Sequence, residues 1–270
     1  MTATNDSTPV QDPRRTDRRV FDAMLPYLTD RFGNAASLNH TFGWAAQDAC
    51  DYAREQIAGI IHARAGREII FTSSGDESNI LAVKGVADTY AHSGNHIITT
   101  TCAHPSILET CHVLEKEEHY YVTRLEADGT GCPDPDALRA AITDGTNLIT
   151  LSLRPNGHNI PERIVTTGRL VKRAEVFFHV DATDVVEHYT IDVQANEIHL
   201  LSIDGNGIGG PPGTGTLYVR SRKPRINLVP LIHGGGQENG WRSGTLNVPG
   251  IVGLGAACVL NGKGKETPNT

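Results

Sequence analysis

Acidic and histidine side chains near the ends of apolar runs are the residues of this sequence best suited to chemistry. His179 lies within one such run, Asp181 and Asp184 follow it, Asp204 follows another, and His104 precedes a predicted helix. Carboxylates and imidazoles that meet in one cavity can move protons or bind a metal ion. Taken singly, His104 is typical of a helix cap or a surface residue, and Asp181 of a turn. The spacing of His179, Asp181 and Asp184 is by itself weak evidence for a metal site.

Three glycines also occur at the spacing of a known nucleotide-binding motif. Gly205, Gly207 and Gly210 match G-x-G-x-x-G after a predicted strand. A dinucleotide-binding fingerprint requires a helix to begin there, because the N-terminus of that helix holds the pyrophosphate. The continuation over residues 211–215 is PPGTG, followed by another strand, so we reject a dinucleotide site.

The cysteines point to a reducing environment. They are odd in number, scattered and never arranged as C-x-x-C, which excludes a disulfide framework and a zinc knuckle. We interpret them as reduced thiols in or near the core of a cytoplasmic protein, with Cys102 the one expected to reach the surface. The five are Cys50, Cys102, Cys111, Cys132 and Cys258.

Composition excludes several classes of function. The 270 residues carry a net charge of −7 without a basic stripe, which argues against nucleic-acid binding. No apolar run is long enough to cross a bilayer. The segment 1–20 is a polar lead-in without the apolar core of a signal peptide, and 261–270 is expected to be a frayed tail.

The elements that must position these residues alternate between strand and helix. A helix is predicted over 46–61, and an apolar helix-like run covers 251–260. Predicted strands are 68–72, 96–100, 120–125, 146–153, 176–180, 200–203 and 214–219. Predicted helices are 77–89, 106–116, 133–141 and 162–173. This alternation predicts an α/β fold with a mostly parallel sheet, helices on both faces and ligands at the carboxyl ends of the strands.

Several stretches together resemble the cysteine desulfurases of the class V aminotransferase group. They occur in that family's order between about Phe21 and Ala257. The stretches are Phe21–Leu28, Arg31–Asn34, Phe71–Ser73, Cys102–Leu108, His179–Thr183, Gly213–Arg220, His233–Glu238 and Arg242–Thr245. The resemblance implies the large domain of a fold type I pyridoxal-phosphate enzyme over 21–260, usually a homodimer. Its implied activity is sulfur transfer, in the setting of iron–sulfur cluster assembly.

The resemblance also assigns cofactor contacts. Asp181 matches the aspartate that keeps the pyridine nitrogen protonated, which the ring needs in order to accept electrons. His104 matches the histidine that stacks on the ring and shuttles protons. Asn156 falls where an asparagine bonds the ring's 3-oxygen. Thr245 matches a hydroxyl that the partner subunit supplies to the phosphate.

The remaining cofactor positions depart from the family. Gly207 stands where the Schiff-base lysine should be, and neither it nor the neighbouring Asn206 can replace an amine. In the phosphate cup, Asp76 after Gly75 replaces a threonine and Asp204 replaces a serine or threonine. Asp184 replaces a glutamine at the ring oxygen. Carboxylates close to a phosphate dianion repel it, so we predict weak or absent pyridoxal phosphate.

The family's nucleophilic cysteine and substrate-binding arginine are expected beyond Thr270, the arginine in a small C-terminal domain that this sequence lacks. None of the five cysteines matches the nucleophile. The first hypothesis is therefore a non-catalytic homologue that acts through its surface, as a homodimer or as a heterodimer with an active relative.

Three alternatives remain. The acids, with His104 and His158, could bind Mg²⁺, Ca²⁺ or Mn²⁺ in a repurposed pocket. The chain could be half of a split, functional desulfurase. Pyridoxal phosphate could also bind without a covalent link, with His104 acting as the base.

Overall fold

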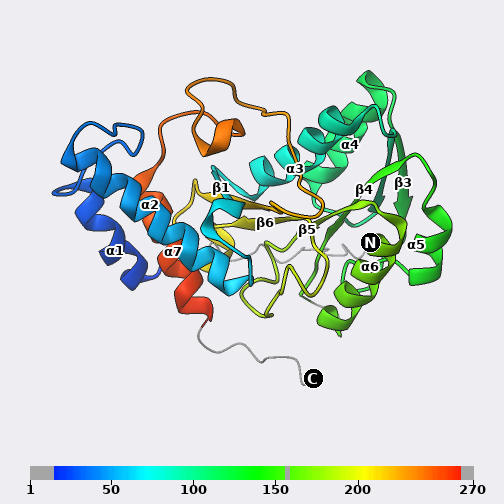
Figure 1. Ribbon diagram of the computed structural model, residues 1–270. Coiled ribbons are helices and arrows are strands. Elements are labelled where there is room, and N and C mark those ends of the chain that lie inside the picture. Colours follow the sequence, from blue (N-terminus) through cyan, green and yellow to red (C-terminus); the bar gives the residue numbers. More distant parts are fainter. Residues whose placement is uncertain (1–14, 156–158, 263–270) are drawn as a thin grey trace, which may run out of the picture.

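A seven-stranded mixed sheet forms the centre of the computed structural model, which describes residues 15–155 and 159–262 (Figure 1). The strand order is β1-β7-β6-β5-β4-β2-β3, and only β7 runs antiparallel to its neighbours. The strands are β1 (Ile69–Thr72), β2 (His96–Thr100), β3 (Tyr121–Leu125), β4 (Thr146–Ser152), β5 (Phe177–Asp181), β6 (Leu200–Asp204) and β7 (Gly215–Val219). The predicted, mostly parallel sheet is confirmed.

Helices cover both faces of the sheet, as predicted (Figure 1). They are α1 (Arg18–Leu28), α2 (Thr41–Ile60), α3 (Gly75–Tyr90), α4 (Pro105–Glu117), α5 (Pro135–Ala141), α6 (Ile160–Ala174) and α7 (Val248–Gly262). Three single 3₁₀ turns add η1 (Gly66–Glu68), η2 (Asn206–Ile208) and η3 (Glu238–Gly240). Local sequence fixes several helix starts. For example, Asp134 caps the first turn of α5 and Pro135 supplies a compatible first residue.

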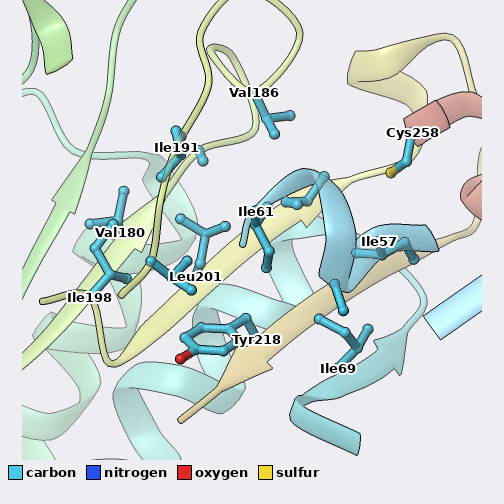
Figure 2. Packing of buried hydrophobic residues seen from close by; sticks show 14 of the residues in the cluster. Ile57, Ile61, Ile69, Val180, Val186, Ile191, Ile198, Leu201, Tyr218 and Cys258 are labelled. Atoms are coloured by element: carbon cyan, nitrogen blue, oxygen red, sulfur yellow. The ribbon is translucent and has the colours of Figure 1, made fainter. Parts of the chain in front are cut away.

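The core is split into two apolar layers by the alternation of side chains along the strands. In β1, Ile69 and Phe71 join the layer under α2, α6 and α7, whereas Ile70 joins the layer under α3 and α4. Figure 2 shows the first layer, where Ile69 of β1 lies beside its cross-strand partner Tyr218 of β7. Each helix therefore has a fixed face of the sheet to cover, and this fixes where its N-terminus lies.

Helix boundaries near both ends of the described chain differ from the sequence prediction. Helix α1 begins at Arg18, inside the predicted polar lead-in, because Asp17 caps it and also donates its backbone N–H to Gly209 O at 3.1 Å. Helix α7 continues to Gly262, two residues into the predicted tail, and the residues after it lie outside the described part.

A loop over residues 232–247 is tied down by a buried carboxylate. Glu238 is 6% exposed and accepts hydrogen bonds from Phe71 N at 2.7 Å and from Arg54 Nη1 at 2.8 Å. A second tie joins Arg242 Nε to Glu77 Oε1 of α3 at 2.9 Å. These contacts fasten the loop to α2, β1 and α3.

Gly215 is a position where the fold requires glycine. It opens β7 directly against the turn that leads into α3, and a Cβ atom there would overlap the backbone of Ser74. The missing side chain lets strand and turn approach each other closely.

No helix within 15–155 or 159–262 is long and apolar enough to span a membrane.

Candidate functional site

A cavity of about 1030 Å³ opens at the carboxyl ends of β1, β5 and β6, where ligands bind in sheets of this kind. Most of its lining comes from the loops that follow strands and from the first turn of α3. The lining residues are Arg15, Ser74, Gly75, Asp76, Asn79, His104, Pro155, Thr183, Asp184, His188, Asp204, Asn206 and Gly207. The cavity thus brings together six of the predicted cofactor-binding residues, Gly75, Asp76, His104, Asp184, Asp204 and Asn206, together with Gly207.

Asp204 is the most highly connected acid of the cavity. It ends β6, and its Oδ1 accepts a hydrogen bond from Gly75 N at 3.0 Å. Its Oδ2 accepts another from Gly207 N at 3.2 Å. Gly75 is the first residue of α3, so this carboxylate lies against the positive end of that helix.

His104 caps α4 and also lies close to Asp76. Its Nδ1 accepts a hydrogen bond from Ser106 N at 3.2 Å, which is the capping role considered for a lone histidine. Asp76 Oδ1 is 3.4 Å from the same nitrogen. The two contacts need opposite states of Nδ1, because capping uses its lone pair and pairing with Asp76 uses a proton. Asp76 is mostly exposed, with 62% of its side chain accessible.

Asp181 lies beneath the cavity rather than on its wall. It is 4% exposed and accepts hydrogen bonds from Ser152 Oγ at 3.1 Å, Asn79 Nδ2 at 3.2 Å and Thr183 N at 3.1 Å. The Oδ1 atom of Asn79 is buried without a partner. Burial lowers the pKa of nearby His179 to about 4, against the opposing effect of Asp181, so this histidine is neutral and belongs to the core.

Asp184 faces a cation that the sequence did not single out. Arg154 Nη1 is 3.8 Å from Asp184 Oδ2, and Arg154 Nη2 donates to the Cys102 carbonyl at 2.6 Å. Both side chains are partly exposed, so the attraction between them is weak.

Gly207 contributes a backbone surface to the cavity. A Cβ atom built there would lie 3.2 Å from Thr183 O, so a side chain at this position needs only a small adjustment. Neither lysine nor cysteine is among the residues that line the cavity within the described chain. Lys84 pairs with Asp88 and Glu118, and Lys172 pairs with Glu197.

Two predicted residues are not in this cavity. Thr245 is exposed on the loop 232–247 and is not part of the lining. Asn156 lies outside the described residues, as does His158, which was considered for a metal site.

The sequence prediction missed several lining residues, among them Ser74, Asn79 and Thr183. A signal existed for Ser74, because Ser-x-x-Glu marks a helix start. Its Oγ accepts from Glu77 N at 3.1 Å, and Glu77 Oε2 accepts from Ser73 N at 2.7 Å. Asn79 and Thr183 carry no local signal, since only the fold brings them to the cavity.

The G-x-G-x-x-G segment forms a single 3₁₀ turn, η2, and leads into β7, so the prediction that no α-helix begins there is confirmed. In the described ranges, no three histidine, cysteine, aspartate or glutamate side chains are grouped so as to hold a metal ion.

Cys102 is partly exposed while the other four cysteines are buried. Burial raises the pKa of Cys50 and of Cys111 to about 12, which makes those thiols poor nucleophiles.

The sheet and cavity define a fold type I large domain, and known proteins identify its family. The aminotransferase class-V model matches residues 12–265, so the chain belongs to that family. A cysteine desulfurase IscS of Ehrlichia chaffeensis is 43% identical over 96% of this chain and 62% of its own length. One of Rickettsia rickettsii is 46% identical over 90% of this chain and 59% of its own length. This protein is a cysteine desulfurase-like member of the family.

Solved structures give the same result. "SspA in complex with cysteine" superposes with a TM-score of 0.82 at 36% identity, over 91% of this chain and 70% of that one. A NifS-like protein superposes with a TM-score of 0.82 at 31% identity, over 92% and 67%. The chain spans about three fifths of the length of the curated relatives it matches.

Proposed function

We propose that this protein is a cysteine desulfurase-like homologue without desulfurase activity, which acts by binding a partner. The proposal rests on Gly207, which lines the cavity and which the family resemblance assigns to the position of the Schiff-base lysine. The described residues that line the cavity include neither a lysine nor a cysteine. Without an amine there is no covalent anchor for the cofactor aldehyde and no base at the substrate's α-carbon.

The cavity also fits pyridoxal phosphate poorly at its phosphate end. A phosphate dianion needs free backbone donors and cations, whereas here Asp204 lies against those donors and Asp76 is close by. Asp181 remains in place beneath the cavity, but a ring-nitrogen partner alone does not hold the cofactor. We infer that pyridoxal phosphate binds weakly or not at all.

The test is sulfide release from cysteine by the purified full chain, with and without added pyridoxal phosphate. We expect no sulfide and no yellow absorbance that borohydride abolishes, with an active cysteine desulfurase as positive control. Gly207→Lys alone should not release sulfide, because the acids remain and no cysteine lines the cavity. Release by the unaltered chain would overturn the proposal, and release by Gly207→Lys would overturn our account of the cavity.

An apolar surface supports the partner-binding role. Large apolar side chains are exposed along α1, along α2 and between them, and we call them the α1–α2 patch. Its members are Phe21, Leu25, Leu28, Phe32, Leu38, Phe42, Trp44 and Tyr52. A groove of about 770 Å³ lies beside the patch, lined by α1, α2 and α7. Clustered apolar exposure of this kind marks protein interfaces, and we propose a homodimer formed through it.

Sedimentation of Phe32→Glu tests this interface, with Tyr121→Glu as the matched control. Tyr121 is 70% exposed on β3, at the far end of the sheet from α1 (Figure 1). The dimer should be lost with Phe32→Glu and kept with Tyr121→Glu. A monomeric unaltered chain that associates with an active relative would replace the homodimer by a heterodimer, and association with neither would contradict the proposal.

A reducing compartment is part of the proposal. All five cysteines are free in the structure, and such thiols persist where disulfides are kept reduced. We therefore place the protein in the cytoplasm. Neither a nucleic acid nor a membrane is among its proposed partners.

A further inference from the structure

Three of the first four backbone N–H groups of α3, those of Gly75, Glu77 and Ser78, already donate to acceptors of the chain itself. Glu77 N donates to Ser74 Oγ, and Ser78 N donates to Ser74 O at 3.1 Å. Gly75 N donates to Asp204 Oδ1, and on the opposite side of the same carboxylate Gly207 N donates to Oδ2. Asp204 therefore bridges the first turn of α3 and the η2 turn.

This arrangement is the one an anion would make at a helix N-terminus. Free backbone N–H groups and the helix dipole attract a negative group there. Asp204 places a carboxylate at that spot from within the chain, held by two backbone hydrogen bonds of 3.0 and 3.2 Å. The sequence predicted only repulsion between this acid and a phosphate, but the structure adds occupation of the donors.

We propose that Asp204 is a built-in anion that fills the phosphate-binding end of the cavity. This inference rests on the proposed function, because it supplies the reason why pyridoxal phosphate is excluded. A phosphate that entered would have to displace a tethered carboxylate from Gly75 N and Gly207 N, and would then lie beside its charge. Covalent attachment gives that carboxylate a high local concentration, which no dissolved anion matches.

The other acids of the cavity differ from Asp204 in a way that allows a controlled test. Asp76 approaches His104 and Asp184 approaches Arg154, so both are near side-chain cations or potential cations. Among the residues that the structure describes, neither acid accepts a hydrogen bond from a backbone N–H of the first turn of α3. Removing either acid reduces negative charge in the cavity but frees none of those backbone donors.

The experiment is calorimetric titration of the full chain with pyridoxal 5′-phosphate, inorganic phosphate and pyridoxal. Asp204→Ser should bind pyridoxal 5′-phosphate and inorganic phosphate at least tenfold more tightly than the unaltered chain. Its affinity for pyridoxal, which lacks the phosphate, should change less than threefold. Asp184→Gln is the matched control for lost charge, and because Asp184 is assigned to the ring-oxygen end of the cavity, the change should alter the affinity for inorganic phosphate less than threefold.

If Asp204→Ser and Asp184→Gln raised the affinity for inorganic phosphate equally, charge alone would explain the exclusion of phosphate, and the inference would be overturned. It is also overturned if Asp204→Ser gains no phosphate affinity. If Asp204→Ser does not fold, Asp204→Asn keeps the shape, removes the charge and must show at least a threefold gain. Sulfide release tests the proposed function separately, so either idea can fail while the other stands.

Discussion

Glu238 and Asp204 are carboxylates that each join segments far apart in the sequence, but they do so in different surroundings. Glu238 is buried, faces the Arg54 guanidinium and accepts the Phe71 N–H. Asp204 is half-buried and is held by backbone N–H groups alone. The resemblance assigns Glu238 to a stretch that matches the family and Asp204 to a position that departs from it. A retained motif can thus serve the fold, so its presence is no evidence that the family's reaction is retained.

The largest expected effect on stability follows from neutralising the buried carboxylate of Glu238. Glu238→Gln removes the buried counter-charge of the Arg54 guanidinium and leaves only the exposed Asp51, 3.5 Å away, so it should cost about 3–5 kcal/mol of unfolding free energy. Urea unfolding followed by circular dichroism measures this loss. Glu117→Gln, at an exposed site on α4, is the control and should change stability by less than about 0.5 kcal/mol. A similarly small loss of stability for both variants would mean that Glu238 does not hold the fold together.

A second effect concerns a buried histidine of the same framework. Burial, aided by Arg220, lowers the pKa of His199 to about 3, and its Nδ1 accepts a hydrogen bond from Phe178 N at 3.0 Å. The unfolded chain takes up this proton near pH 6.5 whereas the folded chain resists it, so stability falls as the pH drops below 6.5.

Between pH 6.5 and pH 4.5 the His199 contribution should be about 2–3 kcal/mol. Urea unfolding at the two pH values should therefore show a smaller pH dependence for His199→Gln than for the unaltered chain. Parallel pH curves would mean that this histidine does not resist protonation in the folded state.

The smallest effect is expected in the cavity. Asp204→Ser removes a carboxylate from the start of α3, a change comparable to loss of a helix cap, and should cost about 1 kcal/mol. Thermal unfolding at neutral pH measures it. A loss as large as that of Glu238→Gln would mean that Asp204, too, is chiefly a framework residue.

The alternation of apolar runs was enough to predict the framework. It gave every strand of the described chain to within a residue or so and both helical layers, because the period of each run matches one buried face. It could not give the direction of β7, which is set by pairing with β1 and β6. It also missed α1, whose start depends on the Asp17 cap and on a contact with Gly209.

The sequence predicted which acids line the cavity, but not which groups those acids contact. The resemblance placed Asp76, Asp184 and Asp204 at one site, and the structure brings them to one cavity. It gave no warning that Asp204 accepts from Gly75, which lies 129 residues earlier in the chain. Arg154 was likewise missed as the neighbour of Asp184, because sequence separation carries no information about such pairs.

The single reversed strand has a consequence for how the cavity is held in shape. Since β7 enters the sheet at the edge where β6 leaves it, its first residue, Gly215, abuts the turn at Ser74. Any larger residue there would push that turn, and α3 with it, away from Asp204. The shape of the cavity therefore depends on Gly215, a residue that does not itself line the cavity.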